Sequence, residues 1–166
     1  MKKQGFTLIE LLIVMAIIAI LAVGLIAALD PLEQIRKGTD TGVRSTATEF
    51  KKAVERYYAA TQKMPWCDAS GCNTPTGQSL TSLNTAAYKT AVNNLINAGE
   101  LKSNFLTAAQ TQLPLVFITE PSTGNIISCF LPTSKSFQSD DTNTIYNLSG
   151  GAGTNCTTAP CYWCIQ

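Results

Sequence analysis

The chain opens with a long apolar segment in which only one residue is charged. From Phe6 to Leu29 every side chain is uncharged except that of Glu10. As a helix this segment is about 24 residues and about 36 Å long, enough to cross the hydrocarbon core of a bilayer. An ionised carboxylate in hydrocarbon is costly unless it is paired. Glu10 therefore marks a functional position and is expected to have a cationic partner.

Residues 30–62 keep a helical period but become amphipathic. Apolar or weakly polar positions recur three, four or a multiple of these apart, at Leu32, Ile35, Val43, Thr46, Phe50, Val54 and Tyr57. The opposite face is predicted to carry the charges, namely Glu33, Arg36, Lys37, Asp40, Arg44, Lys51, Lys52, Glu55 and Arg56. We predict that the apolar stripe packs against a globular domain of the same chain. A free coiled coil is disfavoured because Gly38 and Gly42 interrupt the stripe.

Local signals give the ends and weak points of this helix. Pro31 removes a backbone donor and is predicted to kink or locally unwind it. Helical structure is expected to end near Gln62, because Met64 precedes Pro65 and a residue before proline disfavours helical geometry. Asp40 with Arg44, and Lys51 with Glu55, are spaced for ion pairs one turn apart.

The remaining residues, 63–166, are predicted to form one small globular domain. Residues 66–79 are typical of a loop, and residues 83–98 are predicted to form a helix capped by Gly99. Residues 115–119, 126–131 and 144–148 are predicted strands, the first two joined as a hairpin. The expected fold is α+β: a long N-terminal helix packed against a small antiparallel sheet, followed by a disulfide-rich C-terminal loop.

Composition argues against several classes of function. The chain of 166 residues contains no histidine, which removes the commonest general base and metal ligand. No nucleophile, base and orienting group have a recognisable spacing, so we predict neither catalysis nor a cofactor. The net charge of +1 does not indicate a nucleic-acid partner.

A short basic leader precedes the apolar segment. Lys2 and Lys3 lie ahead of Gly5, and the positive-inside rule places them in the cytoplasm, with everything after the apolar segment outside. If a peptidase cut after Gly5, the new α-amino group of Phe6 would lie about one helical turn from Glu10. That amine is a cation able to neutralise the buried carboxylate.

The leader, the residues Gly-Phe-Thr-Leu-Ile-Glu at 5–10 and the apolar helix together resemble the N-terminus of the type IV pilin superfamily. The resemblance implies cleavage after Gly5 by a prepilin peptidase, N-methylation of Phe6, and a role for Glu10 in aligning an incoming subunit with the amine of its neighbour. It also implies four regions: a leader (1–5), a membrane and filament-core helix (6–29), an amphipathic continuation (30–62) and an extracellular domain (63–166).

The function implied by this resemblance is that of a structural subunit of a type IV pilus, used for adhesion, motility or DNA uptake. Its partners would be other pilins in a homopolymer, the prepilin peptidase, and an inner-membrane assembly platform with its ATPase. The subunit would cross the cytoplasmic membrane once before assembly and then join an extracellular filament. A type II secretion or competence pseudopilin is the alternative, and a membrane-anchored redox or binding protein is a third reading.

Two simpler readings of the N-terminus are disfavoured. Ala22-Val23-Gly24 imitates a signal-peptidase site, but the apolar segment is too long for a secretory signal and contains Glu10. A plain single-pass anchor does not account for that carboxylate either.

Six cysteines in an exported domain are first interpreted as disulfides, which stabilise a small core. They are Cys67, Cys72, Cys129, Cys156, Cys161 and Cys164. We expect Cys67 to pair with Cys72, and Cys129 to pair with Cys156, Cys161 or Cys164, and the resemblance also implies a C-terminal loop closed onto the sheet. A redox pair at Cys161 and Cys164 lacks a following helix, and a zinc site of the last four cysteines has only one pair with suitable spacing.

Three further groups of residues are weaker candidates for functional sites. Asp140-Asp141-Thr142-Asn143 offers oxygen ligands, but not at the spacing of a defined calcium loop, and a solvated turn is the simpler interpretation. Asn147 and Asn155 begin glycosylation triplets. Three aromatic residues could form an exposed contact surface or pack against the disulfides: Trp66, Tyr162 and Trp163.

Overall fold

The structure is a computed structural model that describes residues 5–28, 30–68, 70–72, 74, 78–79, 89–122, 124–140, 142–145 and 161–165. The chain divides into two units, Met1–Ile35 and Arg36–Gln166, and each is described by itself.

The first unit contains helix α1 (Leu8–Ala28) and the start of α2 (Pro31–Thr61). Pro31 is the first residue of α2, where its missing N–H costs nothing. Asp30 caps that helix, because its carboxylate accepts the backbone N–H of Glu33 at 3.2 Å. Pro31 therefore begins a helix after an interruption, and does not bend a continuous one. The local cause is the Asp-Pro pair, which is a strong helix start.

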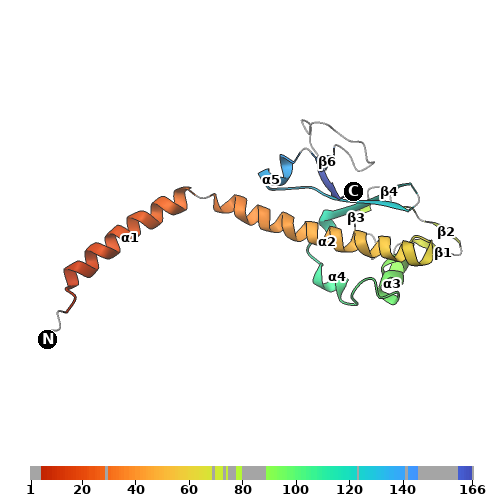
Figure 1. Ribbon diagram of the computed structural model, residues 1–166, viewed down its shortest axis with the longest axis horizontal. Coiled ribbons are helices and arrows are strands. Elements are labelled where there is room, and N and C mark those ends of the chain that lie inside the picture. The colour runs from red at the N-terminus through yellow and green to blue at the C-terminus, as the bar shows by residue number, and fades with distance from the viewer. Residues whose placement is uncertain are drawn as a thin grey trace. The chain divides into compact units, whose positions relative to one another are not determined.

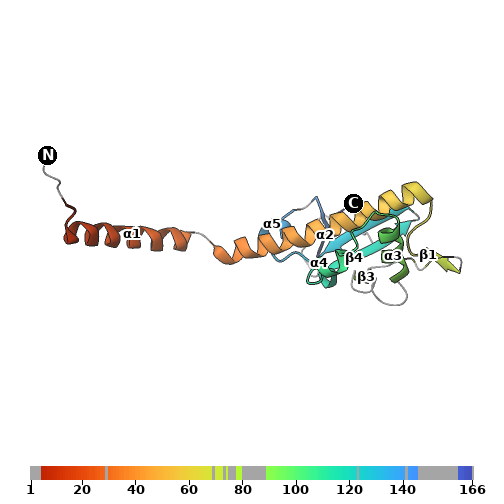
Figure 2. The same cartoon turned by 90° about the horizontal axis from the view of Figure 1, so that it is seen from below.

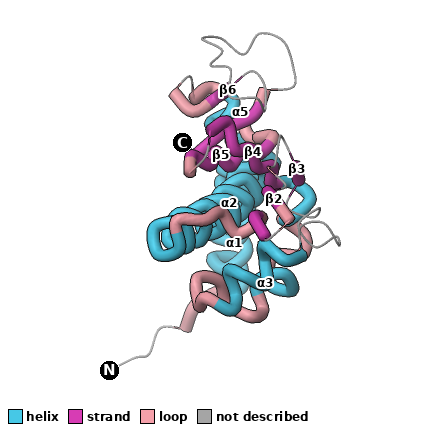
Figure 3. Tube along the Cα trace, turned by 90° about the vertical axis from the view of Figure 1, so that its right-hand side faces the viewer, coloured by secondary structure: helices cyan, strands magenta, loops and turns pink. Residues whose placement is uncertain are grey.

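In the second unit α2 lies between two layers. Figure 1 shows the sheet on one side of α2, and α3 (Lys89–Asn97) with α4 (Phe105–Ala108) on the other. Figure 3 shows α3 on the side of α2 away from β4 and β5. The core is built around the fully buried Phe50 of α2, whose ring stacks with that of Phe105 at 6.2 Å between centroids. Ala91 and Leu95, on one face of α3, are completely buried. The predicted α+β architecture is confirmed.

The sheet is antiparallel and has the order β3-β4-β5-β7-β6. Figure 2 shows β4 running alongside α2. The strands are β3 (Gln78–Ser79), β4 (Val116–Ser122), β5 (Asn125–Phe130), β6 (Thr144–Ile145) and β7 (Tyr162–Ile165). The hairpin of β4 and β5 was predicted, although the strands extend further into the connection than expected. The last strand of the chain, β7, was predicted as a tail, yet it lies inside the sheet between β5 and β6.

Shorter elements complete the second unit. Strands β1 (Cys67–Asp68) and β2 (Gly71–Cys72) pair within the segment predicted as a loop, and a 3-10 helix η2 (Leu113–Leu115) and helix α5 (Lys135–Gln138) flank the hairpin. Helix α3 ends in a Schellman motif: Glu100 N–H donates to Leu95 and Gly99 N–H to Ile96, both at 2.9 Å. Gly99 has φ +76°, so it is the predicted cap. The predicted start of this helix lies outside the described residues.

The buried face of α2 differs from the predicted stripe at both ends. Leu32 and Ile35 are 64% and 66% exposed, and both belong to the first unit, which ends at Ile35. Asp40 and Lys51, assigned to the charged face, are 2% and 8% exposed. Lys51 pairs with Glu55 as predicted. Asp40 does not pair with Arg44, since its carboxylate accepts hydrogen bonds from a different segment of the chain.

Candidate functional site

The start of α1 is closed by a reciprocal pair of hydrogen bonds between Thr7 and Glu10. The Glu10 carboxylate accepts the backbone N–H of Thr7 at 2.8 Å and its hydroxyl at 2.6 Å. In return, the backbone N–H of Glu10 donates to the Thr7 hydroxyl oxygen at 3.3 Å. This is a capping box, in which the residue before the helix and the third helical residue satisfy each other's orphan donors.

The capping box supplies hydrogen bonds to Glu10 but no positive charge. Thr7 is a neutral partner, and residues 5–28 include no Lys or Arg. The positive end of the helix dipole also favours a carboxylate at this position. Gly5 and Phe6 lie immediately upstream and are exposed, so the peptide bond between them is sterically open. The carboxylate is therefore oriented by its own helix, and among the described residues it has no ion-pair partner.

Sequence reasoning identified Glu10 but missed Thr7. The signal was present, because Thr-x-x-Glu immediately before an apolar run is the pattern of a capping box. The structure thus adds Thr7 to the set formed by Gly5, Phe6 and Glu10.

The rest of α1 is apolar on every side. Leu8–Ile26 has a mean hydropathy of 3.0, and none of this stretch is buried within the chain. A helix that is apolar all round needs an apolar environment, such as a bilayer or the interior of an assembly. In length and composition α1 is able to cross a membrane.

Comparison with known families addresses the same residues. Residues 1–26 match the family described as the prokaryotic N-terminal methylation motif. This N-terminus is prepilin-like. The motif is the hallmark of type IV pilins and pseudopilins, and it implies processing by a prepilin peptidase. Together with α1, it fits membrane anchoring before assembly. No curated protein and no solved structure matches the chain.

In the domain beyond this prepilin-like segment, the described cysteines are oxidised. Cys67 is bonded to Cys72, and Cys129 to Cys164 across β5 and β7. Cys161 is also disulfide-bonded, and Cys156 lies outside the described residues. Because Cys164 is bonded to Cys129, it does not form a redox pair with Cys161. Two of the four proposed zinc ligands are committed to the same bond.

The two tryptophans are buried and point their indole N–H groups at carboxylates. Trp66 is 3% exposed and donates to Glu120 at 2.7 Å, and Trp163 is 4% exposed and donates to Asp140 at 2.9 Å. An exposed surface formed by both tryptophans is therefore excluded. Half-buried Tyr162 packs edge-on against Phe117 at 5.5 Å between ring centroids. Each indole needs a hydrogen-bond acceptor once it is buried, and the acidic side chains supply it.

Asp140 closes the turn that was considered for calcium. The side-chain amide of Asn143, the indole of Trp163 and the backbone N–H of Thr142 all donate to its carboxylate. These hydrogen bonds, that of Asn143 first, lower the pKa of Asp140 below its ordinary value. The carboxylate is therefore engaged in holding the turn on β7. Asp141 and the two glycosylation triplets at Asn147 and Asn155 lie outside the described residues.

Proposed function

We propose that this chain is a structural subunit that polymerises through its N-terminal helix into an extracellular filament of the type IV pilus kind, used for adhesion, motility or DNA uptake. The observation that carries the proposal is a Glu10 that is oriented by Thr7, and that has no cationic partner among the described residues, at the start of an apolar helix inside a methylation motif. The implied role is structural and not catalytic.

The proposed assembly step creates the missing charge. Hydrolysis of the Gly5–Phe6 peptide bond by the prepilin peptidase releases residues 1–5 and leaves an α-amino group on Phe6. Thr7 keeps the Glu10 carboxylate at the helix start, where it can meet the amine of its own or of a neighbouring subunit. In hydrocarbon an ion pair is less costly than an isolated charge. Subunits aligned so that Glu10 meets the Phe6 amine are therefore favoured over subunits packed with the two groups apart.

The regions of the chain then have distinct roles. The helix of residues 6–29 would anchor the subunit in the cytoplasmic membrane and later pack in the filament core. Residues 30–62 would connect it to the domain of residues 63–166, which faces the medium. An inner-membrane platform and its ATPase would drive the transfer between these two environments.

The proposal is tested with Glu10→Ala and Glu10→Gln, using Glu49→Ala as a control at an exposed position of α2. Both Glu10 variants should be cleaved at Gly5 and inserted in the membrane, yet yield far fewer filaments in the sheared fraction. Mass spectrometry of the mature N-terminus and electron microscopy provide the two readouts. Wild-type filament yield from Glu10→Ala would refute the role assigned to this carboxylate.

The motif does not separate a pilin from a secretion or competence pseudopilin. A strain lacking the chain should lose surface fibres if it is a major pilin. Retention of all fibres, with the protein confined to the membrane and a defect in protein export or DNA uptake, would instead identify a pseudopilin.

A further inference from the structure

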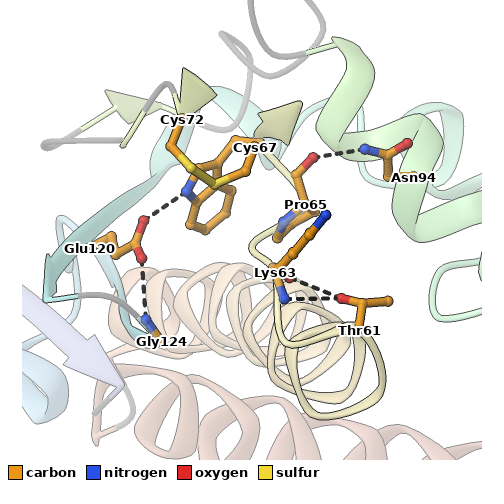
Figure 4. Close-up of a disulfide and its surroundings, with 9 residues drawn as sticks. Thr61, Lys63, Pro65, Cys67, Cys72, Asn94, Glu120 and Gly124 are labelled. Carbon is orange, nitrogen blue, oxygen red and sulfur yellow. Dashed lines mark hydrogen bonds between the residues drawn. A yellow bond between two sulfur atoms is a disulfide. The ribbon is translucent and has the colours of Figure 1, made fainter. Parts of the chain in front are cut away.

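A cavity of about 280 Å³ lies beyond the C-terminal end of α2. Its walls include Lys63 and Met64 just after the helix, the Cys67–Cys72 disulfide, and Glu120 of β4. Figure 4 shows Glu120 and its bond to Gly124 beside that disulfide. The disulfide closes the β1–β2 pair, so this wall is covalently held.

Among the described residues, Glu120 is a buried carboxylate without a cationic partner. It is 9% exposed, and its two oxygens accept the Trp66 indole N–H at 2.7 Å and the Gly124 backbone N–H at 3.2 Å. Both donors are neutral, and neither ion pair in the described part of the chain includes Glu120. Each carboxylate oxygen can accept a further hydrogen bond. A buried charge of this kind is strongly stabilised by an ammonium group that enters the cavity.

The cavity lining also includes a lysine that has no ion-pair partner among the described residues. Lys63 is exposed, and in the described structure its ammonium group takes part in neither a hydrogen bond nor an ion pair. The half-buried Tyr58 ring and Thr74 also line the space. The cavity is thus lined by one buried acidic side chain and one exposed basic side chain.

We propose that this cavity binds a free α-amino acid with a small apolar side chain. The ammonium group of the ligand would pair with Glu120, and its carboxylate would pair with Lys63. Met64 and the disulfide offer an apolar surface to the side chain. A purely cationic ligand would meet repulsion from Lys63, and a purely anionic one would meet repulsion from Glu120. This binding is independent of filament assembly.

The test is equilibrium dialysis of the detergent-solubilised full-length chain against radiolabelled L-alanine. Ethylamine and propionate are matched competitors, because each keeps one of the two charged groups of alanine. Alanine should bind, and either competitor should bind at least about tenfold more weakly, since each loses one charge-assisted contact. Ethylamine binding as tightly as alanine would overturn the proposal in favour of a simple cation site. Absence of alanine binding at millimolar concentration would overturn it outright.

Two variants test which residue pairs with each charged group of alanine. Lys63→Met should weaken alanine binding at least about tenfold and leave ethylamine binding unchanged or tighter. Glu120→Gln keeps an acceptor for Trp66 while removing the charge, and it should weaken both. Lys52→Met, an exposed lysine of α2 outside the cavity, is the control. Equal alanine binding by the Lys63→Met and Lys52→Met variants would contradict the assignment of Lys63, which the fold does not need.

Discussion

The carboxylate of Asp40 on α2 accepts the backbone N–H of Ser134 at 2.7 Å. It also accepts the backbone N–H and the hydroxyl of Thr133, both at 2.9 Å. The segment between β5 and α5 is thereby attached to a helix 94 residues earlier in the chain. Because Asp40 is only 2% exposed, water does not compete for these bonds.

Replacing Asp40 should therefore destabilise the domain more than replacing an exposed carboxylate on the same helix. Asp40→Ala leaves the donors of Thr133 and Ser134 without their acceptor, and we expect a loss of about 3 kcal/mol in unfolding free energy. Urea unfolding followed by fluorescence of the buried tryptophans measures this value. Glu49→Ala, an exposed carboxylate on the same helix, should change it by less than about 0.5 kcal/mol. Equal effects from the two variants would contradict the attachment described here.

The lowered pKa of Asp140 makes part of the stability dependent on pH. In the unfolded chain this carboxyl takes up its proton at a higher pH than in the folded domain, where Asn143 and Trp163 donate to its charged form. The contribution is complete above the ordinary pKa and is lost as the pH falls through the lowered folded value. Between about pH 5 and about pH 2, the unfolding free energy of the wild type should fall more steeply than that of Asp140→Asn. Parallel pH profiles for the two proteins would count against this assignment.

Ser128 presents the opposite case of a buried polar group that weakens the fold. It is fully buried on β5, and within the described part of the chain its hydroxyl has no hydrogen-bond partner. Ser128→Ala removes an unsatisfied hydroxyl and should leave stability unchanged or raise it by up to about 1 kcal/mol. Ser128→Val adds volume at the same site and should lower stability by about 1–3 kcal/mol. Thermal unfolding of the two variants compares them directly, and a clear loss in the alanine variant would point to an unrecognised partner of the hydroxyl.

Thr7 can be tested separately from Glu10. Thr7→Val preserves shape but removes the hydroxyl that donates to the Glu10 carboxylate, whereas Thr7→Ser retains it. If orientation of the carboxylate promotes assembly, the valine variant should lose about fivefold in filament yield, matching the roughly 1 kcal/mol value of a cap. The serine variant should resemble the wild type, and both should be cleaved at Gly5. Equal yields from valine and serine would show that the capping box does not contribute.

Features with local causes were predictable from the sequence. The end of α2 at Thr61 follows from Met64-Pro65 nearby, and the Gly99 cap follows from the residues around it. The length and composition of the apolar segment were enough to predict helix α1. The set of Gly5, Phe6 and Glu10 was visible for the same reason, since all three lie within one short stretch.

Features that depend on distant partners were not predictable. Helical periodicity assigns Asp40 to the charged face. No signal in the neighbouring sequence indicates that residues 133–134 supply hydrogen-bond donors to it. Strand β7 is four residues long and was predicted as a tail, because its pairing with β5 and β6 comes from segments remote in sequence. The cavity beside Glu120 likewise joins a helix end to a strand far along the chain.

The position of β7 also sets an order of events in time. Residues 162–165 follow β6 in sequence, yet in the described sheet they lie between β5 and β6 and join them. Until this strand has emerged, β5 lacks a neighbour on one side and Cys129 has no Cys164 to bond. A nascent chain could therefore place α1 in a membrane while the sheet at its other end was still unfinished. The sheet would be completed only after residues 162–165 had been delivered to the compartment in which the domain folds.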